Sequence, residues 1–251
     1  MIRKEDLLQI ARFKGLAPRL AELDYFQDIA LLNIAREFGN KLIFKGGTCL
    51  YKAYKLNRFS EDLDFTAAKG FKEAMLYRLP SFFNLLNIQS KMKVESFTKS
   101  INIYLEVLGP LYEGRKESIA RIIFNISRRE RVLLPINRFS HAPLYQEIRP
   151  FDLFIMDENE ILAEKVRAIH ERNKARDVYD LWHLLKRRLL PFNFKLVNKK
   201  LSSIGLKFEK AGFAAKLKEK EAGWKRDLAA LISGELPPFE QVSKEIMQCL
   251  N

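Results

Sequence analysis

The stretch "LIFKGGTCLYKAYKLNRFSEDLDF", residues 42–65, combines a β-like run, two glycines, an amphipathic segment and two aspartates separated by one residue. The apolar run followed by Gly46 and Gly47 predicts a strand, a tight turn and then a helix. Glycines at such a turn let backbone N–H groups approach a phosphate at the start of the helix. A plain strand-to-helix turn explains the same residues, and the motif lacks the Gly-Lys-Ser/Thr ending of a Walker A loop.

The two aspartates follow in the segment "DLDF". Residues two apart on a strand point to the same face, so Asp62 and Asp64 would present their carboxylates together while Leu63 and Phe65 face the core. Such a pair suits Mg²⁺, which binds a few carboxylate oxygens and leaves positions for phosphate and water. Taken alone, Asp-x-Asp is also compatible with a solvated strand edge.

A basic segment adjoins these carboxylates. Residues 41–60 contain no acidic side chain and five basic ones, which are Lys41, Lys45, Lys52, Lys55 and Arg58. Carboxylates hold a cation and basic groups hold a polyphosphate, so the combination predicts a site for both. The whole chain has 44 basic and 31 acidic residues and a net charge of +13. This excess favours a polyanionic partner, nucleic acid ahead of a membrane surface.

The periodicity of apolar residues divides the 251-residue chain into two parts. Helical periodicity covers residues 3–38, and it returns after residue 157. Between them lie helix-like stretches at 48–56 and 71–86 and β-like segments at 41–44, 62–67, 90–97, 101–108 and 119–126. We predict an α/β domain with a mixed sheet and N-terminal packing helices over residues 1–156, and a mostly helical domain over residues 157–251.

Cysteine content and hydropathy exclude several classes of protein. Cys49 and Cys249 are far apart and have no metal-ligand spacing, which argues against a disulfide framework or a zinc site. No apolar run approaches the roughly 18 residues of a membrane helix. The amino terminus "MIRKEDLLQIARFKG" has the pattern of an amphipathic helix and not of a signal peptide. We therefore expect a cytoplasmic protein without a membrane partner.

A second motif-like region, "ILAEKVRAIHERNKARDVYDLWHLL", covers residues 161–185. Asp157 is placed to cap its first helix, and Lys165 lies at the edge of that helix's apolar stripe. A lysine there suits a phosphate, although a surface lysine with a buried stem fits the same pattern. In the next helix Asp177 falls in the first turn, and Asp180 lies four residues from Arg176, an ordinary ion-pair spacing.

The blocks "FKGGTCLYKAY" (44–54), "RFSEDLDF" (58–65) and residues 161–185 together resemble the AbiEii-type nucleotidyltransferases. These are toxins of abortive-infection and type IV toxin–antitoxin systems, within the polymerase β-like nucleotidyltransferase superfamily. The three blocks occur in the family's order over most of residues 40–190. The resemblance implies a polymerase β-like nucleotidyltransferase fold for the N-terminal domain.

The resemblance also implies roles for individual residues. The family's glycine turn and Ser-x-Asp-x-Asp strand would bind nucleotide phosphates. Asp62 and Asp64 would hold the metal ion, Mg²⁺ or Mn²⁺. The matching turn and strand residues are Gly46, Gly47, Thr48, Ser60, Asp62 and Asp64. The helical blocks match Glu164, Lys165, Arg176, Asp177 and Asp180. We expect the catalytic residues to be Asp62, Asp64, Lys165 and Asp177. Lys165 would also bind the nucleotide. The supporting residues would be Lys45, Arg58, Glu164, Arg176 and Asp180.

One position departs from the superfamily pattern. A third carboxylate usually lies on a later strand, and in "ARIIFNISRRE" (120–130) Asn125 stands at the expected place. The nearest acid is Glu130. Either Glu130 supplies the missing group, or the two aspartates work with a single metal ion.

The implied reaction is transfer of a nucleotide from an NTP to an RNA acceptor, with the 3′ end of a tRNA expected, and with a cognate antitoxin as partner. There are two alternatives. The same fold would modify a protein or a small molecule, or the protein would bind RNA without catalysis. The candidate RNA surface has eight basic residues, namely Arg115, Lys116, Arg121, Arg128, Arg129, Arg131, Arg138 and Arg149.

Overall fold

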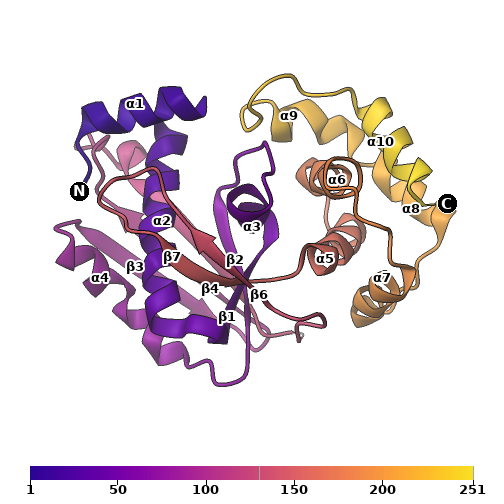
Figure 1. Ribbon diagram of the computed structural model, residues 1–251, viewed down its shortest axis with the longest axis horizontal. Helices are drawn as coiled ribbons and strands as arrows, with labels where there is room; N and C mark the ends of the chain where they lie inside the picture. The colour runs from indigo at the N-terminus through magenta and orange to yellow at the C-terminus, as the bar shows by residue number, and fades with distance from the viewer. Residues whose placement is uncertain (130, 251) are drawn as a thin grey trace. The chain divides into compact units, whose positions relative to one another are not determined.

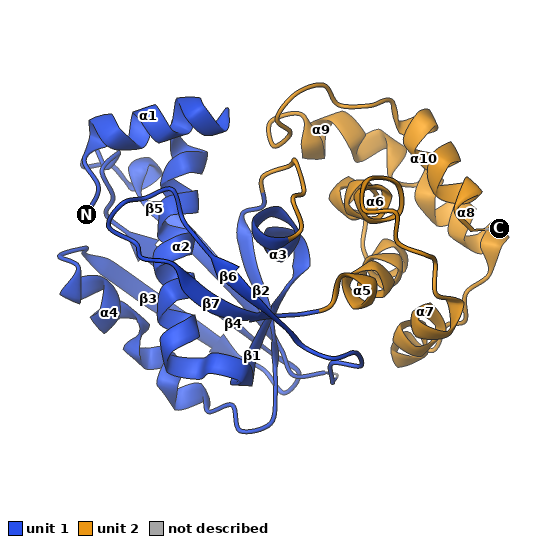
Figure 2. Cartoon of the chain, in the orientation of Figure 1, with its two compact units in different colours: residues 1–53, 60–156 blue, residues 54–59, 157–251 orange. Residues whose placement is uncertain are grey.

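The computed structural model describes residues 1–129 and 131–250, which form two compact units (Figure 2). Unit 1 contains Met1–Ala53 and Ser60–Met156, and unit 2 contains Tyr54–Phe59 and Asp157–Asn251. The predicted mixed α/β fold is confirmed. None of the helices in the described part of the chain is both long and apolar enough to span a membrane.

Unit 1 is built on a seven-stranded sheet with the order β3-β4-β5-β2-β1-β7-β6 (Figure 1). The sheet is mixed, because β2 pairs with β5 and β1 with β7 in parallel while the other neighbours are antiparallel. The strands are β1 (Leu42–Lys45), β2 (Asp62–Ala67), β3 (Ser90–Ser96), β4 (Ser100–Val107), β5 (Ala120–Ser127), β6 (Asn137–His141) and β7 (Phe151–Ile155).

In the described part of unit 1, four α-helices accompany the sheet. They are α1 (Lys4–Lys14), α2 (Pro18–Phe38), α3 (Gly46–Ala53) and α4 (Leu79–Leu85). Helix α2 is buried over most of its middle part, and it contacts β5, β7 and α4. Its Phe26 packs near Phe83 of α4 with ring centroids 6.3 Å apart. On β4 the buried residues alternate with half-exposed ones, so one face of the sheet joins this core and the other remains partly accessible.

The strand predictions at β1 to β5 agree with the structure to within about a residue at most ends. Strands β6 and β7 had no predicted counterpart. The segment of β6, "NRFSH", is mostly exposed and lacks the apolar alternation that identifies a strand. The predicted helix at 71–86 divides into a 3₁₀-helix, Glu73–Arg78, and α4, whose start is marked by Pro80.

Unit 2 is mostly helical. Its α-helices are α5 (Glu158–Glu171), α6 (Ala175–Trp182), α7 (Phe194–Leu201), α8 (Lys210–Lys218), α9 (Trp224–Leu228) and α10 (Phe239–Gln248). Asp157 caps α5 as predicted, because its side chain accepts a hydrogen bond from the Asn159 N–H at 2.9 Å. The predicted apolar stripe of Leu162, Val166 and Ile169 is buried.

The segment Tyr54–Phe59, between α3 and β2, also belongs to unit 2. The Phe59 N–H donates to the Leu231 carbonyl at 2.7 Å, and the Tyr179 hydroxyl donates to Asn57 at 2.6 Å. The predicted helix at 48–56 therefore ends earlier, at Ala53. Nothing in the local sequence indicates that these six residues leave the sheet unit.

Candidate functional site

Asp62 and Asp64 share one face of β2, as their spacing predicts. Both are half-buried, whereas Leu63 and Phe65 between and beyond them are fully buried. Strand β2 lies inside the sheet between β1 and β5, so its backbone is fixed on both sides. The two carboxylates therefore project from a rigid strand and remain partly accessible to a ligand.

Asn125 stands next to Asp64 on the neighbouring strand. The parallel β2–β5 register pairs these two residues, and the Asn125 side-chain amide donates to Asp64 Oδ1 at 3.1 Å. A carboxylate at this position would repel Asp64 unless a cation lay between them. The sequence located this position, and the structure shows that its amide supports the Asp64 carboxylate. Glu130, the other candidate, lies outside the described residues.

Gly46 begins α3 directly against Asp64. Its φ is +73°, and a Cβ at this position would lie 2.3 Å from Asp64 Oδ2 and 2.8 Å from the Asp64 Cβ. Both the dihedral angle and the lack of space require glycine. Gly47 follows as a buried residue of α3. The turn predicted from the sequence thus brings the start of α3 into contact with the second aspartate.

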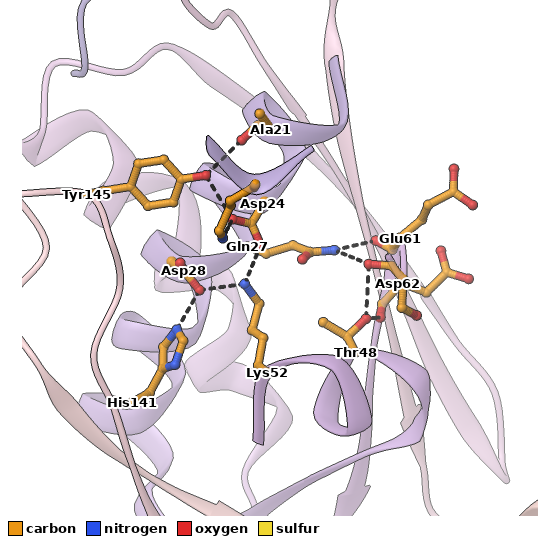
Figure 3. Close-up of polar contacts among 12 residues, drawn as sticks. Ala21, Asp24, Gln27, Asp28, Thr48, Lys52, Glu61, Asp62, His141 and Tyr145 are labelled. Carbon is orange, nitrogen blue, oxygen red and sulfur yellow. Dashed lines mark hydrogen bonds and ion pairs between the residues drawn. The ribbon is translucent and has the colours of Figure 1, made fainter. Parts of the chain in front are cut away.

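Thr48 and Gln27 hold the chain that leads into β2 (Figure 3). The buried Thr48 hydroxyl contacts the carbonyls of Ser60, at 3.2 Å, and Asp62. The Gln27 side-chain amide donates to the carbonyls of Ser60 and Glu61 at 2.9 and 2.8 Å. The Thr48 hydroxyl therefore donates its proton to backbone carbonyls, and in this way Thr48 positions Asp62. Its role as a nucleotide contact stays a prediction, as does that of Ser60.

A buried ion network joins α3 to α2 (Figure 3). Lys52 of α3 places its Nζ 2.8 Å from Asp24 Oδ1 and 2.6 Å from Asp28 Oδ1, with its side chain only 3% exposed. The Tyr145 hydroxyl donates to Asp24 at 2.8 Å, and His141 Nε2 lies 2.8 Å from Asp28. We call this the α2–α3 network; its members are Lys14, Asp24, Asp28, Lys52, His141 and Tyr145.

The electrostatics of the α2–α3 network favour fixed charges. Burial alone would raise the pKa of Asp24, but Lys52 and Lys14 overcome this effect and lower that pKa below its ordinary value. Burial would likewise lower the pKa of Lys52, and its two aspartates raise it instead. Lys52 was interpreted from the sequence as part of a basic segment for polyphosphate. The structure places its ammonium inside the fold, where it fastens α3.

Unit 2 contains a second cluster of buried charges. The guanidinium of Arg58 donates to both Asp180 oxygens, at 2.6 and 2.7 Å. Lys165 Nζ lies 2.9 Å from Asp177 Oδ1 and 2.7 Å from Asp180 Oδ2. Arg172, whose side chain is 57% exposed, adds a contact of 2.7 Å to the buried Asp177 Oδ2. We call these five residues the Lys165 cluster. It unites four residues that the resemblance had marked, and it adds Arg172.

Charge pairing sets the protonation of the Lys165 cluster. Burial raises the pKa of Asp177, but Lys165 and Arg172 outweigh burial and hold that pKa well below its usual range. Burial lowers the pKa of Lys165, and Asp177 and Asp180 reverse the shift, so its pKa lies above the ordinary value. Arg58 and Lys165 similarly keep the pKa of Asp180 low against burial. All members are therefore ionised at neutral pH.

The remaining predicted residues have identifiable positions. Lys165 is 6% exposed and so is not a surface lysine. Lys200 Nζ lies 3.0 Å from Glu164 Oε1 and 2.7 Å from Glu160 Oε1. Glu164 therefore has a structural role inside unit 2. Lys45 is buried and faces Asp64 across the β1–β2 ladder. Arg176 is half-buried on α6.

Comparison with known proteins identifies the family. A family model described as "Nucleotidyl transferase AbiEii toxin, Type IV TA system" matches residues 30–245. The chain belongs to the AbiEii family. As an AbiEii protein it is a nucleotidyltransferase toxin of the type IV toxin–antitoxin kind, which implies a nucleotide substrate and an antitoxin partner. The resemblance stated from the three sequence blocks is confirmed. A comparison with curated protein sequences gave no match.

Solved structures share the fold of this AbiEii protein at low identity. MenT4, a nucleotidyltransferase toxin from Mycobacterium tuberculosis, is similar with a TM-score of 0.68 at 19% identity, covering 99% of this chain and 88% of that chain. JHP933 from Helicobacter pylori is similar with a TM-score of 0.64 at 22% identity, covering 93% and 91% of the two chains. At these identities the similarity establishes the fold alone.

Proposed function

We propose that this AbiEii protein transfers a nucleoside monophosphate from an NTP to the 3′-hydroxyl of an RNA, with tRNA as the expected acceptor, in the cytoplasm. The observation that carries the proposal is the contact between the Asp62 and Asp64 strand and the Gly46 turn at the start of α3. This contact brings carboxylates for a cation next to backbone donors for a phosphate. The net charge of +13 supports a nucleic-acid acceptor.

The donor set of this site fits a divalent cation, Mg²⁺ or Mn²⁺. Asp62 and Asp64 are partly accessible oxygen ligands on one strand face, and Mg²⁺ commonly takes one or two carboxylates and completes its shell with water and phosphate. Among the described residues no group of three or more His, Cys, Asp and Glu is arranged for a metal ion. We assign the two aspartates to one cation, because Asn125, the residue beside Asp64, offers an amide and not a third carboxylate. When bound, it would supply positive charge to the phosphate oxygens.

The transfer forms a bond between the acceptor O3′ and the α-phosphorus and breaks the bond from the α-phosphorus to the bridging oxygen, so pyrophosphate leaves, and the proton of the acceptor hydroxyl passes to solvent water. The backbone N–H groups of Gly46 and Gly47, with Ser60, would bind phosphate oxygens. In unit 2, Lys165 is our candidate for a phosphate contact and Asp177 for the acceptor hydroxyl. The low pKa of Asp177 suits it to accept and orient a hydrogen bond, and makes it a weak base at neutral pH.

The test is incubation of the purified protein with total tRNA, Mg²⁺ and each of the four NTPs in turn, radiolabelled in the α-phosphate. Label should enter tRNA with the wild type and not with Asp62→Asn/Asp64→Asn, whose folding is checked by thermal melting. Label in protein or in a small-molecule fraction of cell extract would instead establish another acceptor. No label in any fraction, with intact RNA binding, would overturn the transferase proposal.

Asn125 gives a specific reason to keep a second candidate, RNA binding without catalysis, because the usual third carboxylate is an amide here. That candidate predicts RNA binding that is insensitive to Mg²⁺ and to Asp64→Ala. Asn125→Asp tests the cation site itself, with Asn102→Asp as its control one strand away. Asn125→Asp should lower the melting temperature without Mg²⁺, because the new carboxylate repels Asp64, and Mg²⁺ bound at this position should restore it. Asn102→Asp should show neither effect.

A further inference from the structure

A groove of about 850 Å³ lies at the carboxyl ends of β2 and β5, within unit 1. Strand β2 enters it through Thr66 and Ala67, and the chain after β5 supplies its basic wall. The residues that line it are Thr66, Ala67, Ala68, Lys69, Arg128, Arg129, Arg131, Val132 and Ile136. We call this the basic groove. Its position is defined by the same two strands that carry Asp64 and Asn125.

The lining carries positive charge. Four of its nine described residues are Lys or Arg, and none is acidic. Arg128 pairs with Glu73 outside the lining, while Lys69 and Arg131 are exposed. Guanidinium groups bind phosphate oxygens in pairs of hydrogen bonds. The apolar side chains of Val132 and Ile136, the latter 41% exposed, add surface suited to a sugar or a base face.

The basic groove continues the face that carries the aspartates. Asp62, Asp64 and Thr66 alternate along β2, and the register with β5 is unbroken from Asp62 to Thr66. Two residues of strand advance the chain by about 7 Å, so the inner end of the groove lies one such step beyond Asp64. The Thr66 hydroxyl at this inner end is buried and has no hydrogen-bond partner among the described residues. A polar group is therefore left unsatisfied where the groove begins.

We propose that the basic groove binds the phosphodiester backbone of the acceptor RNA, at the nucleotides just 5′ of the accepting end. The inference rests on the proposed function, since it takes the reacting hydroxyl to be at Asp62 and Asp64. We take the 3′ end of the RNA to lie at Asp62 and Asp64. If the RNA chain then continues along this face of the sheet, the phosphates just 5′ of that end reach the basic residues of the groove. The contacts are to backbone charge and require no particular base sequence.

The RNA surface expected from the sequence is narrowed to the part that lines the basic groove. Of the eight basic residues in that expectation, Arg128, Arg129 and Arg131 belong to the groove lining. Lys69, which follows β2 and lies far from them in sequence, joins them there. The prediction of a binding surface thus becomes a groove with a defined starting point.

The test measures binding of fluorescently labelled total tRNA by Lys69→Gln/Arg131→Gln across a range of salt concentrations. Its matched control is Arg115→Gln/Lys116→Gln, which removes two exposed charges from the expected RNA surface outside the groove. The groove variant should bind at least tenfold more weakly than wild type. Its slope of log affinity against log salt should be shallower by about 0.7 for each single-strand phosphate that the variant no longer neutralises. The control should stay within about twofold of wild type.

Failure of the groove and failure of the transferase proposal give different results. Nucleotide transfer by wild type is measured beside the tRNA affinities of wild type, the groove variant and the control. If transfer is absent but the groove variant alone loses RNA affinity, the groove stands and the activity does not. Equal tRNA affinity and salt slope in wild type and the groove variant would overturn the inference. So would an equal loss in the groove variant and the control, because that would indicate a diffuse surface. Thermal melting establishes that both variants are folded.

Discussion

The α2–α3 network and the Lys165 cluster both pair buried charges, but they differ in how far they reach the surface. In the network the most exposed charged side chain is that of Lys14, at 18%, and Lys52 is 3% exposed. In the cluster Arg58, Lys165 and both aspartates are at most 7% exposed, whereas the Arg172 side chain is 57% exposed. Unpaired buried charges cost several kcal/mol each, by roughly the scale of ionic desolvation. We therefore expect both sets to stabilise their own unit, and the Lys165 cluster alone of the two to extend to solvent, where a ligand has access.

The largest expected effect is that of Lys52→Met. Removing the ammonium leaves Asp24 and Asp28 without their shared partner, and breaking a buried pair in this way costs about 3–5 kcal/mol. The free energy of unfolding from urea denaturation measures it, and Lys91→Met, at an exposed lysine, is the control. A loss below about 1 kcal/mol, the scale of a surface pair, would remove the structural role assigned to the network.

The other end of α3 is tested by Gly46→Ala. Its Cβ would displace the Asp64 carboxylate, and its positive φ adds strain of about 1–3 kcal/mol. Gly114→Ala separates the two effects, because Gly114 has φ +81° and no described atom within 4 Å of the added Cβ. Both variants should lose stability, but only Gly46→Ala should lose nucleotide transfer. Equal activity in the two would show that the contact with Asp64 does not matter for the reaction.

Lys165→Met sharpens the comparison directly, because Lys165 and Lys52 are buried to a similar degree. The two arginines of the cluster still balance Asp177 and Asp180 after the substitution, so the expected loss of stability is about 1–3 kcal/mol, less than for Lys52→Met. Nucleotide transfer should nevertheless be abolished. If Lys165→Met destabilises as much as Lys52→Met, the two arginines do not compensate Asp177 and Asp180 for the loss of Lys165.

The smallest expected effect is one of pH. The folded-state pKa of Asp177 is lowered, so its contribution is present above the unfolded pKa of about 3.9 and is lost as pH falls through the folded value. The pKa of Lys165 is raised, so its contribution is present below about 10.4 and is lost as pH rises through the folded value. From about pH 5 to 9 the stability difference between wild type and Asp177→Asn should stay constant.

A pH profile of kcat/KM adds a kinetic measure of the same prediction. An Asp177 that orients the acceptor produces no acidic limb in this range. An acidic limb near neutral pH that disappears in Asp177→Asn would show a raised pKa and a general-base role in its place.

The parts of the site that the sequence predicted are those encoded by adjacent residues. The Asp62 and Asp64 face follows from strand alternation, and the Gly46 turn follows from a glycine pair between an apolar run and a helix. The fold class followed from the same periodicities together with the family resemblance. Asn125 was located from the superfamily pattern, and the β2–β5 register, which the sequence did not predict, places it beside Asp64.

The parts that the sequence missed depend on pairing between distant segments. Asp24 and Asp28 lie 28 and 24 residues before Lys52, and nothing local distinguishes them from surface acids. Their one signal is spacing: two acids four residues apart within the apolar stretch of α2 would both be buried. Arg58 gave no such signal, because its partner Asp180 lies 122 residues away.

The segment Tyr54–Phe59 also affects when the protein becomes complete during synthesis. Phe59 is hydrogen-bonded to Leu231, and 231 minus 59 gives a separation of 172 residues. At about 5–20 residues per second a ribosome needs roughly 10–30 s to make that length. Until then the loop between the glycine turn and the aspartate strand lacks its final anchor. A nascent chain therefore holds this loop without its Leu231 hydrogen bond until residue 231 has left the ribosome.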